Sequence, residues 1–297
     1  MKKTLRLRAF AKINAGLRIL AKRSDGYHEI RTIYQTIALA DRLEICLVKP
    51  GKGIDVECDN PHVPAGHANL VYRAGELWAS ARGWHGHIGI RIKKKIPLGS
   101  GLGGASTDAA AALLGLERLT GHGLDFSVRH SLAAALGSDV PLFLLGGRVL
   151  GCGRGEEIYP LSDLPPRACL VVFPGFAVST AEAYREAGLR LTAEAGTAYI
   201  GKVGAWPQFP LLSWGPAEND FEPVVFARWP ELARLKRRLI RAGAEVASLT
   251  GSGSAVYALF ASPRQIAHAS KLIPKGWLSF RTRTLLRADY HRKLFEQ

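Results

Sequence analysis

The sequence has no long uncharged hydrophobic run, and it contains few cysteines. The longest apolar stretch, Ser131–Cys152, includes Asp139 and Arg148, which argues against a membrane-spanning helix. The cysteines show no C-x-x-C spacing and have no histidines at zinc-like intervals, so we interpret them as reduced thiols; they are Cys46, Cys58, Cys152 and Cys169. A disulfide framework and a zinc site are therefore not expected.

A secretory signal is also missing from the start of the chain. Met1–Lys3 is basic, but Arg6 and Arg8 interrupt any apolar segment, and no small-residue cleavage site follows. The sequence therefore predicts a cytoplasmic protein with no membrane partner.

Acidic residues are few relative to basic ones. Forty Lys and Arg residues stand against 25 Asp and Glu residues, which gives a net charge of +15. Such an excess suits an anionic partner, whether a nucleotide, a phosphorylated metabolite or a nucleic acid. The 47% hydrophobic and 22% charged residues are typical of a globular enzyme. A length of 297 residues favours two lobes or domains.

Hydrophobic periodicity predicts both strands and helices in the first half of the chain. Apolar residues alternate with polar ones over residues 5–9 and 88–92, which is typical of half-buried strands. Helical spacing occurs over residues 69–82, and an alanine-rich helix is expected over residues 106–119. No internal repeat or low-complexity segment is present.

A hinge is expected near residues 154–166, where glycine, glutamate and two adjacent prolines cluster. It would divide the chain into an N-terminal lobe, residues 1–155, and a C-terminal substrate-binding lobe, residues 156–297. Within the second lobe, residues 191–216 mix Gly, Pro and Trp without a period and are expected to form a loop.

An amphipathic helix is predicted from Pro230 to Gly243. Its apolar positions follow helical spacing, at Leu232, Leu235, Leu239 and Ile240. A strand-like run, Ala255–Phe260, follows the glycine-containing stretch Thr250–Ser254. Strands mixed with helices, without regular alternation, favour an α+β fold.

The strongest local signal is the glycine-rich loop Pro97–Thr107, between a predicted strand and the alanine-rich helix. Four glycines fall within six positions, at Gly99, Gly101, Gly103 and Gly104. Glycine permits positive φ and a close approach of ligand to backbone, and the following helix N-terminus can bind polyphosphate. Ser106 and Thr107 add hydroxyls that are candidates for contact with Mg²⁺.

Other interpretations of the loop remain. It is not a Walker A loop, because no Gly-Lys-[Ser/Thr] follows the glycines. It also lacks the strand–helix–strand frame and the downstream acidic residue of a dinucleotide-binding loop. A tight turn that only packs a strand against a helix is the structural alternative.

Two charged residues stand in apolar surroundings. Lys12 lies in an apolar strand, where a lysine requires an anionic partner or an escape to solvent. Asp139 lies within the apolar segment 137–143, where a carboxylate is costly unless it is paired. A solvated lysine and an ordinary turn aspartate are the alternatives. The stretch Thr250–Ser254, between the predicted helix and strand, is equally consistent with a plain turn.

These pieces, in this order, resemble the GHMP kinase superfamily. The loop Pro97–Ala105 is similar to its motif P-x-x-x-G-L-G-[S/G]-[S/G], although Gly104–Asp108 varies on the usual pattern. The resemblance is narrowed to one branch by Ala11–Asn14 (AKIN), Arg23–Glu29 (RSDGYHE), Leu136–Pro141 (LGSDVP), Asn219–Pro223 (NDFEP) and Leu249–Ser254 (LTGSGS). That branch phosphorylates the 2-hydroxyl of 4-diphosphocytidyl-2-C-methyl-D-erythritol with ATP, in non-mevalonate isoprenoid precursor biosynthesis.

The resemblance implies a two-lobed α+β fold with the active site in the cleft between the lobes. It implies that Asp139 is the catalytic base and that Lys12 holds this carboxylate ionised and neutralises charge on the moving phosphoryl group. The ATP phosphates and a bridging Mg²⁺ would be held by the loop, that is Pro97, Leu98, Gly99, Ser100, Gly101, Leu102, Gly103, Gly104, Ala105, Ser106 and Thr107. The resemblance leaves the Mg²⁺ ligands open.

The same resemblance implies where the substrate binds. Tyr27, His28 and Tyr184 would hold the cytosine, because aromatic faces stack on a flat base. Asn14 and Thr180 would place the erythritol and phosphate portion.

Two rival functions remain. Another GHMP enzyme, such as homoserine or mevalonate kinase, is disfavoured by Tyr27 and His28 after Asp25-Gly26. A nucleic-acid-binding protein is suggested by the charge and by Lys93–Lys95, but no recognition motif accompanies this short run. We therefore expect small-molecule partners, no nucleic acid, and a monomer or homodimer.

Overall fold

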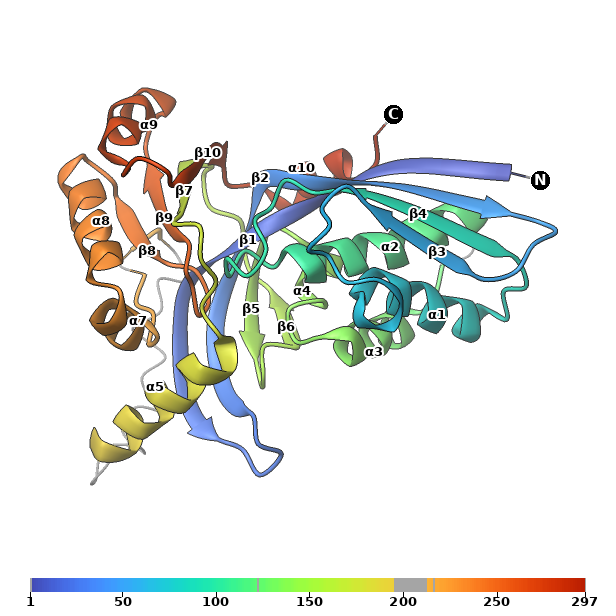
Figure 1. The fold of residues 1–297 in the computed structure, drawn as a ribbon, viewed down its shortest axis with the longest axis horizontal. Coiled ribbons are helices and arrows are strands. Elements are labelled where there is room, and N and C mark those ends of the chain that lie inside the picture. The colour runs from blue at the N-terminus through green and yellow to red at the C-terminus, as the bar shows by residue number, and fades with distance from the viewer. Residues whose placement is uncertain (1, 122, 195–212, 216, 297) are drawn as a thin grey trace.

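The computed structural model describes residues 2–121, 123–194, 213–215 and 217–296, which form two β-sheets with helices packed against them (Figure 1). The strands are β1 (Lys2–Lys22), β2 (His28–Val48), β3 (Ile54–Cys58), β4 (His87–Lys93), β5 (Arg148–Cys152), β6 (Glu157–Pro160), β7 (Ala168–Phe173), β8 (Val246–Leu249), β9 (Val256–Phe260) and β10 (Leu278–Arg283). The helices are α1 (Leu70–Arg82), α2 (Gly104–Thr120), α3 (Phe126–Leu136), α4 (Leu142–Leu145), α5 (Thr180–Glu194), α7 (Glu222–Arg228), α8 (Pro230–Arg241), α9 (Pro263–Ala269) and α10 (Arg287–Leu294). The mixed α and β content agrees with the expected α+β class.

The first sheet has six strands and is built on the long β1–β2 hairpin. Its order is β3-β4-β2-β5-β6, and β1 pairs with β2. The antiparallel register of β1 and β2 shifts between Phe10 and Lys12 and again between Asn14 and Leu17. Lys12 and Asn14 lie in the regular segment between these shifts and are two residues apart, so strand alternation puts both side chains on one face of the sheet.

Helices α1, α2 and α3 lie on one face of this sheet (Figure 1). Small residues let α2 approach closely, since the alanines at 109–112 are all buried. A Cβ added at Gly115 would lie 2.6 Å from Cδ1 of Ile45 on β2. The alanine-rich pattern thus serves close packing as well as helix propensity.

The second sheet has four strands in the order β10-β7-β9-β8. Its core includes Leu232, Leu235 and Leu239 of α8. Ile240, predicted on the same apolar stripe, is instead 44% exposed. At 100° per residue Ile240 lies about 80° from Leu232 and further from Leu235, beyond the edge of the buried face.

Side-chain packing, in addition to the chain itself, connects the two sheets. Leu17, Ile19 and Ile30, near the tip of the β1–β2 hairpin, belong to the core of the second sheet. The C-terminal helix α10 returns to the first sheet, where Tyr290 packs on Phe10. The division at residues 155 and 156 stays a prediction.

Most local predictions are confirmed, and three are corrected, the first of which is the position of Ile240. The predicted strands lie in β1, β4 and β9, and the predicted helices correspond to α1, α2 and α8. The expected hinge 154–166 contains strand β6, which pairs with β5, and its place between two lobes stays a prediction. Residues 191–194 of the expected loop belong to α5, and residues 195–212 and 216 lie outside the described residues.

The third correction concerns Thr250–Ser254, which connects two strands, β8 and β9, instead of following a helix. The short strand β8 intervenes because Val246–Leu249, which is buried throughout, pairs antiparallel with β9 at the end of the sheet. Among the helices that the structure describes, none is both long and apolar enough to cross a bilayer.

Candidate active site

A cavity of about 1030 Å³ lies where the β1–β2 hairpin, the start of α5 and the β8–β9 turn meet. Residues that the sequence singled out supply much of its lining; they are Lys12, Asn14, Tyr27, His28, Gly101, Ser106, Asp139, Thr180 and Tyr184. These positions are distributed over 173 residues of chain, yet the fold brings them to one space. The roles assigned to them remain predictions.

Asp139 and Lys12 form an ion pair at this cavity. Asp139 lies in the turn between α3 and α4, and its Oδ2 is 3.2 Å from Lys12 Nζ. The lysine side chain is 3% exposed, whereas the aspartate side chain is 32% exposed. Lys12 therefore has the anionic partner that its burial requires. The expectation of a buried aspartate is corrected, since Asp139 opens to the cavity.

A polar network fixes Lys12 within the strand. Its Nζ donates to Asn14 Oδ1 at 2.7 Å, and Asn14 Nδ2 donates to Thr32 Oγ1 at 2.7 Å. The Lys12 backbone N–H donates to the carbonyl of Leu102 in the glycine-rich loop at 3.0 Å. This network ties the lysine to β2 and to the loop, and both ends are buried.

The two glycine-rich segments touch each other. Thr250 Oγ1 donates to the carbonyl of Gly101 at 3.1 Å, and Ala255 N–H donates to the carbonyl of Ser100 at 3.1 Å. Gly101 has φ of 79°, and an added Cβ would lie 2.1 Å from the Thr250 carbonyl oxygen. Glycine is required here by both backbone conformation and space.

The predicted phosphate loop is only partly open to the cavity. Gly101 and Ser106 line it. Ser100, Leu102 and Thr107 are buried, while the remaining residues are partly or fully exposed elsewhere, namely Pro97, Leu98, Gly99, Gly103, Gly104 and Ala105. Of the two candidate hydroxyls for a metal, Ser106 therefore faces the cavity and Thr107 does not.

The start of α2 suits an anion. The helix has 17 residues, begins at Gly104 after Gly103 in the left-handed conformation, and carries no acidic residue in its first turn. Its unpaired N–H groups and dipole favour bound phosphate. In the part of the chain that the structure describes, no group of three or more His, Cys, Asp or Glu side chains could hold a metal ion. The hydroxyl of Ser106 is one of several side-chain oxygens that line the cavity.

Aromatic side chains gather at the far end of the cavity, near the hairpin tip. The His28 and Tyr184 rings stack with centroids 4.9 Å apart and planes at 13°. Burial, with a smaller effect of Lys22, lowers the pKa of His28, so the neutral ring offers one donor and one acceptor at pH 7. Tyr27 is 53% exposed, and the Arg154 guanidinium lies 4.7 Å from its ring centroid.

Thr180 lies across the cavity from the hairpin. Its Oγ1 is 2.9 Å from Ser252 Oγ in the β8–β9 turn, so the start of α5 and that turn are linked.

Several cavity residues escaped prediction. Lys22, Arg154 and Arg185 line the cavity and add positive charge to that of Lys12. Arg154 is predicted only as part of the expected hinge. The glycines on both sides of it are the signal that another group can approach the backbone closely there. Tyr34 also lines the cavity, and as an aromatic residue in an apolar strand it resembles ordinary core.

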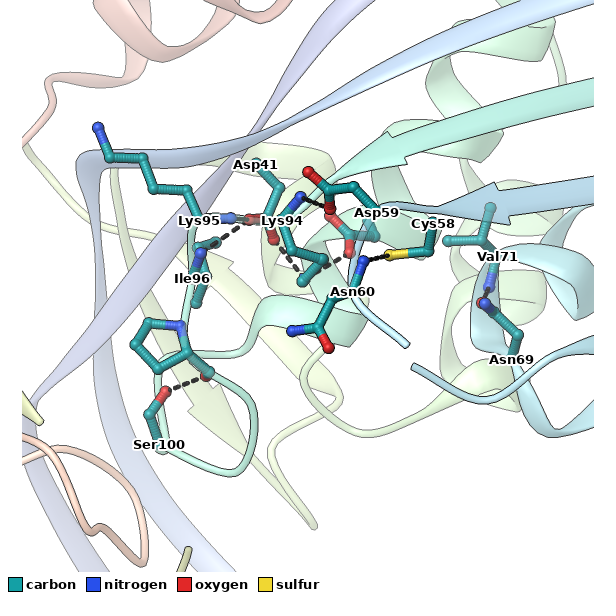
Figure 2. Close-up of polar contacts among 12 residues, drawn as sticks. Asp41, Cys58, Asp59, Asn60, Asn69, Val71, Lys94, Lys95, Ile96 and Ser100 are labelled. Atoms are coloured by element: carbon teal, nitrogen blue, oxygen red, sulfur yellow. Dashed lines mark hydrogen bonds and ion pairs between the residues drawn. The ribbon is translucent and has the colours of Figure 1, made fainter. Parts of the chain in front are cut away.

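A cluster of buried charges holds the end of the segment that leads into the glycine-rich loop. Lys94 Nζ contacts Asp41, and it donates to Asp108 Oδ2 at 2.7 Å. Figure 2 shows Lys94, Lys95 and Ile96 gathered around Asp41, which accepts the backbone N–H groups of Lys95 and Ile96. Burial alone would lower the pKa of Lys94, but the charges of Asp108 and Asp41 outweigh it and raise this pKa. Only the flanking lysines of the basic run are exposed, which weakens the nucleic-acid alternative.

We expect Lys94→Met to destabilise the fold by about 3–5 kcal/mol, because two buried carboxylates lose their cation. Asp108 Oδ1 has no hydrogen-bond partner among the described residues, so this carboxylate depends on the contact of its Oδ2 with the lysine. Urea unfolding measures the loss. Lys95→Met, which removes a neighbouring but exposed charge, is the matched control and should stay within about 0.5 kcal/mol of the parent. Equal unfolding free energies for the two variants would contradict a structural role for the cluster.

Comparisons with known proteins agree with this geometry. The model of the GHMP kinases N terminal domain matches residues 69–147, and that of the GHMP kinases C terminal matches residues 211–271. A 4-diphosphocytidyl-2-C-methyl-D-erythritol kinase of Solibacter usitatus (strain Ellin6076) is 44% identical, over 98% of this chain and 93% of that protein.

Solved structures agree as well. A crystal structure of 4-(cytidine 5'-diphospho)-2C-methyl-D-erythritol kinase is 34% identical with a TM-score of 0.75, over 96% of this chain and 99% of that one. A mevalonate kinase of L. major, in complex with R-mevalonate, has a TM-score of 0.70 at 19% identity, over 96% and 97% of the two chains. The second likeness concerns the fold alone.

Proposed function

Since this chain belongs to the GHMP kinases, and within them to the family of 4-diphosphocytidyl-2-C-methyl-D-erythritol kinases, we propose that Asp139, assisted by Lys12, drives phosphorylation of the 2-hydroxyl of that substrate. The chain is an ATP-dependent small-molecule kinase. The observation that carries the residue assignment is the Lys12–Asp139 pair at a cavity that the predicted phosphate loop also lines.

Asp139 is the general base in this proposal. Its carboxylate is open to the cavity and takes the proton of the substrate hydroxyl as the oxygen attacks the γ-phosphorus of ATP. The new O–P bond forms while the bond to the β-phosphate oxygen breaks, and ADP leaves. Reactions of this type depend on positioning and electrostatics instead of covalent catalysis.

Lys12 has two functions. Its ammonium, 3.2 Å from Asp139 Oδ2, favours the ionised carboxylate, and it offsets negative charge that develops on the transferred group. Because Lys12 is 3% exposed and donates to Asn14, its position is set before substrate binds.

The Pro97–Thr107 loop and the start of α2 bind the ATP phosphates. Mg²⁺, when bound, would neutralise negative charge on the phosphates. The hydroxyl of Ser106 fits a magnesium ion that takes most of its ligands from phosphate and water, as this ion commonly does. Ser106 is the loop hydroxyl best placed to contact it.

The cytidine diphosphate portion occupies the hairpin end of the cavity. Tyr27, His28 and Tyr184 bind the cytosine, while Asn14 and Thr180 place the erythritol portion. The nearby cations of Lys22, Arg154 and Arg185 complement the diphosphate. A cytoplasmic location, where ATP is supplied, belongs to the same proposal.

Tyr184→Ala should raise the KM for the cytidyl substrate by about 5- to 150-fold, because stacking on one base contributes about 1–3 kcal/mol. The KM for ATP should not change. Steady-state kinetics with each substrate varied in turn measures both values. Tyr184→Phe, which keeps a stacking ring, is the control and should resemble the parent; an equal rise in both variants would exclude stacking as the cause.

The proposed function is tested by coupled ADP release from purified protein. The cytidyl-diphospho substrate should be turned over with a far higher kcat/KM than mevalonate or homoserine. Faster turnover of either control would assign the protein to another GHMP reaction, and product analysis by ³¹P NMR would show whether a phosphomonoester forms.

A further inference from the structure

A tyrosine hydroxyl contacts the carboxylate that Lys12 also contacts. Tyr34 Oη, on β2, lies 2.9 Å from Asp139 Oδ1, while Lys12 Nζ lies 3.2 Å from Oδ2. Each carboxylate oxygen therefore has its own partner from a different strand. We propose that Tyr34 is a positioning residue, whose hydroxyl donates to Asp139 and fixes the orientation in which the carboxylate accepts the substrate proton. The inference deepens the proposed function and rests on it.

The direction of this hydrogen bond follows from charge and burial. An ionised carboxylate can only accept, so the tyrosine must donate. Tyr34 is 1% exposed. Burial, and then the negative charge of Asp139, raise the pKa of Tyr34 well above its ordinary value, so the hydroxyl keeps its proton. A bond from a neutral donor to an ionised acceptor is shorter and stronger than one between neutral groups.

The surrounding backbone leaves Tyr34 little freedom. A Cβ added at Gly151, on β5, would lie 2.4 Å from Tyr34 Cε2, and one added at Gly155 would lie 2.3 Å from its Oη. Two glycines thus make the space that the ring and hydroxyl fill. The ring also lies 5.5 Å from Lys12 Nζ. Because the Tyr34 hydroxyl is already fixed, it can orient the Asp139 carboxylate without losing further conformational freedom when substrate binds.

Loss of the hydroxyl would leave Asp139 Oδ1 without this donor. The charged and titratable groups near the pair are Lys12 of β1, Tyr184 of α5 and Glu156, which precedes β6. Lys12 would then act on the carboxylate from one side only. We therefore expect poorer alignment of the base.

The test is Tyr34→Phe, which keeps the ring and removes only the hydroxyl. Its kcat should fall by about 10- to 100-fold, as expected for a misaligned group, while the KM for ATP stays unchanged. The KM for the cytidyl substrate should change less than kcat, because Tyr34 acts on the reaction through Asp139. Tyr290→Phe is the matched control, because Tyr290 is also buried and donates to a carbonyl, that of Phe143, outside the cavity. Its kcat and KM values should equal those of the parent.

A second readout does not depend on the identity of the substrate. The carboxyl-carbon resonance of Asp139, assigned with Asp139→Asn, should have a different chemical shift at pH 7 in Tyr34→Phe, because the hydrogen bond to Oδ1 is lost. In Tyr290→Phe the same resonance should keep the chemical shift of the parent. An unchanged chemical shift in Tyr34→Phe, or a kcat equal to that of Tyr290→Phe, would overturn the inference. An inactive parent protein would contradict the proposed function instead, and the chemical shift would still decide whether Tyr34 contacts Asp139.

Discussion

Asp139→Asn should lower kcat by about 10²- to 10⁴-fold, the range that general acid–base catalysis contributes. The amide has nearly the size and shape of the carboxylate but cannot take the hydroxyl proton. With its oxygen toward Lys12, the amide can donate an N–H to Tyr34 Oη, so the side chain keeps its place and the loss is chemical. Single-turnover kinetics with the cytidyl substrate measures the effect.

Binding of a non-hydrolysable ATP analogue, measured by calorimetry, is the control for Asp139→Asn. The glycine-rich loop and the start of α2 do not include this residue, so the dissociation constant should stay close to that of the parent. Retention of more than a few per cent of the activity would remove Asp139 as the base. Loss of nucleotide binding would point to a structural defect instead.

Lys12→Met should lower kcat by about 10²- to 10³-fold, the effect of removing one preorganised electrostatic donor. Methionine fills a similar volume in a site that is 3% exposed, but it supplies no charge to Asp139 or to the phosphoryl group. The loss of unfolding free energy should be smaller than the rise in activation free energy that corresponds to the lower kcat. The reason is that Asp139 is 32% exposed, so water can solvate its charge when the lysine is absent. Rapid-quench measurement of the chemical step and thermal unfolding separate these effects.

Lys52→Met removes an exposed lysine outside the cavity and controls for the change in net charge. The double variant of Lys12 and Asp139 adds a further check. Groups that act as a unit are not additive, so the double variant should be little slower than Asp139→Asn alone. Multiplicative losses would indicate that the two residues act independently.

Local patterns in the sequence predict the elements whose ends are set by neighbouring residues. Asn69 begins α1 by accepting the N–H of Val71, and Gly121 ends α2 in the left-handed conformation. Strand β6 was missed because its pairing with β5, not its composition, makes it a strand. Ile240 was misplaced because spacing alone does not show where the buried face ends.

The site itself was predictable only in part. Lys12 and Asp139 stood out because each is a charge in an apolar segment, but their pairing came from the family resemblance. The sequence predicts Lys94 only as part of an exposed basic run, because nothing near it in sequence shows that Asp41 and Asp108 surround it. Tyr34 gave no signal, because its polar contact is with a residue 105 positions away.

The long strand β2 carries residues from both ends of the proposed substrate site. Tyr34, beside the proposed base, and His28, at the proposed cytosine end, are six residues apart on it, which is about 20 Å along an extended strand. In this proposal the strand sets the length of acceptor that fills the cavity. A small alcohol that reaches Asp139 would leave the aromatic end empty, so we expect selectivity against short acceptors.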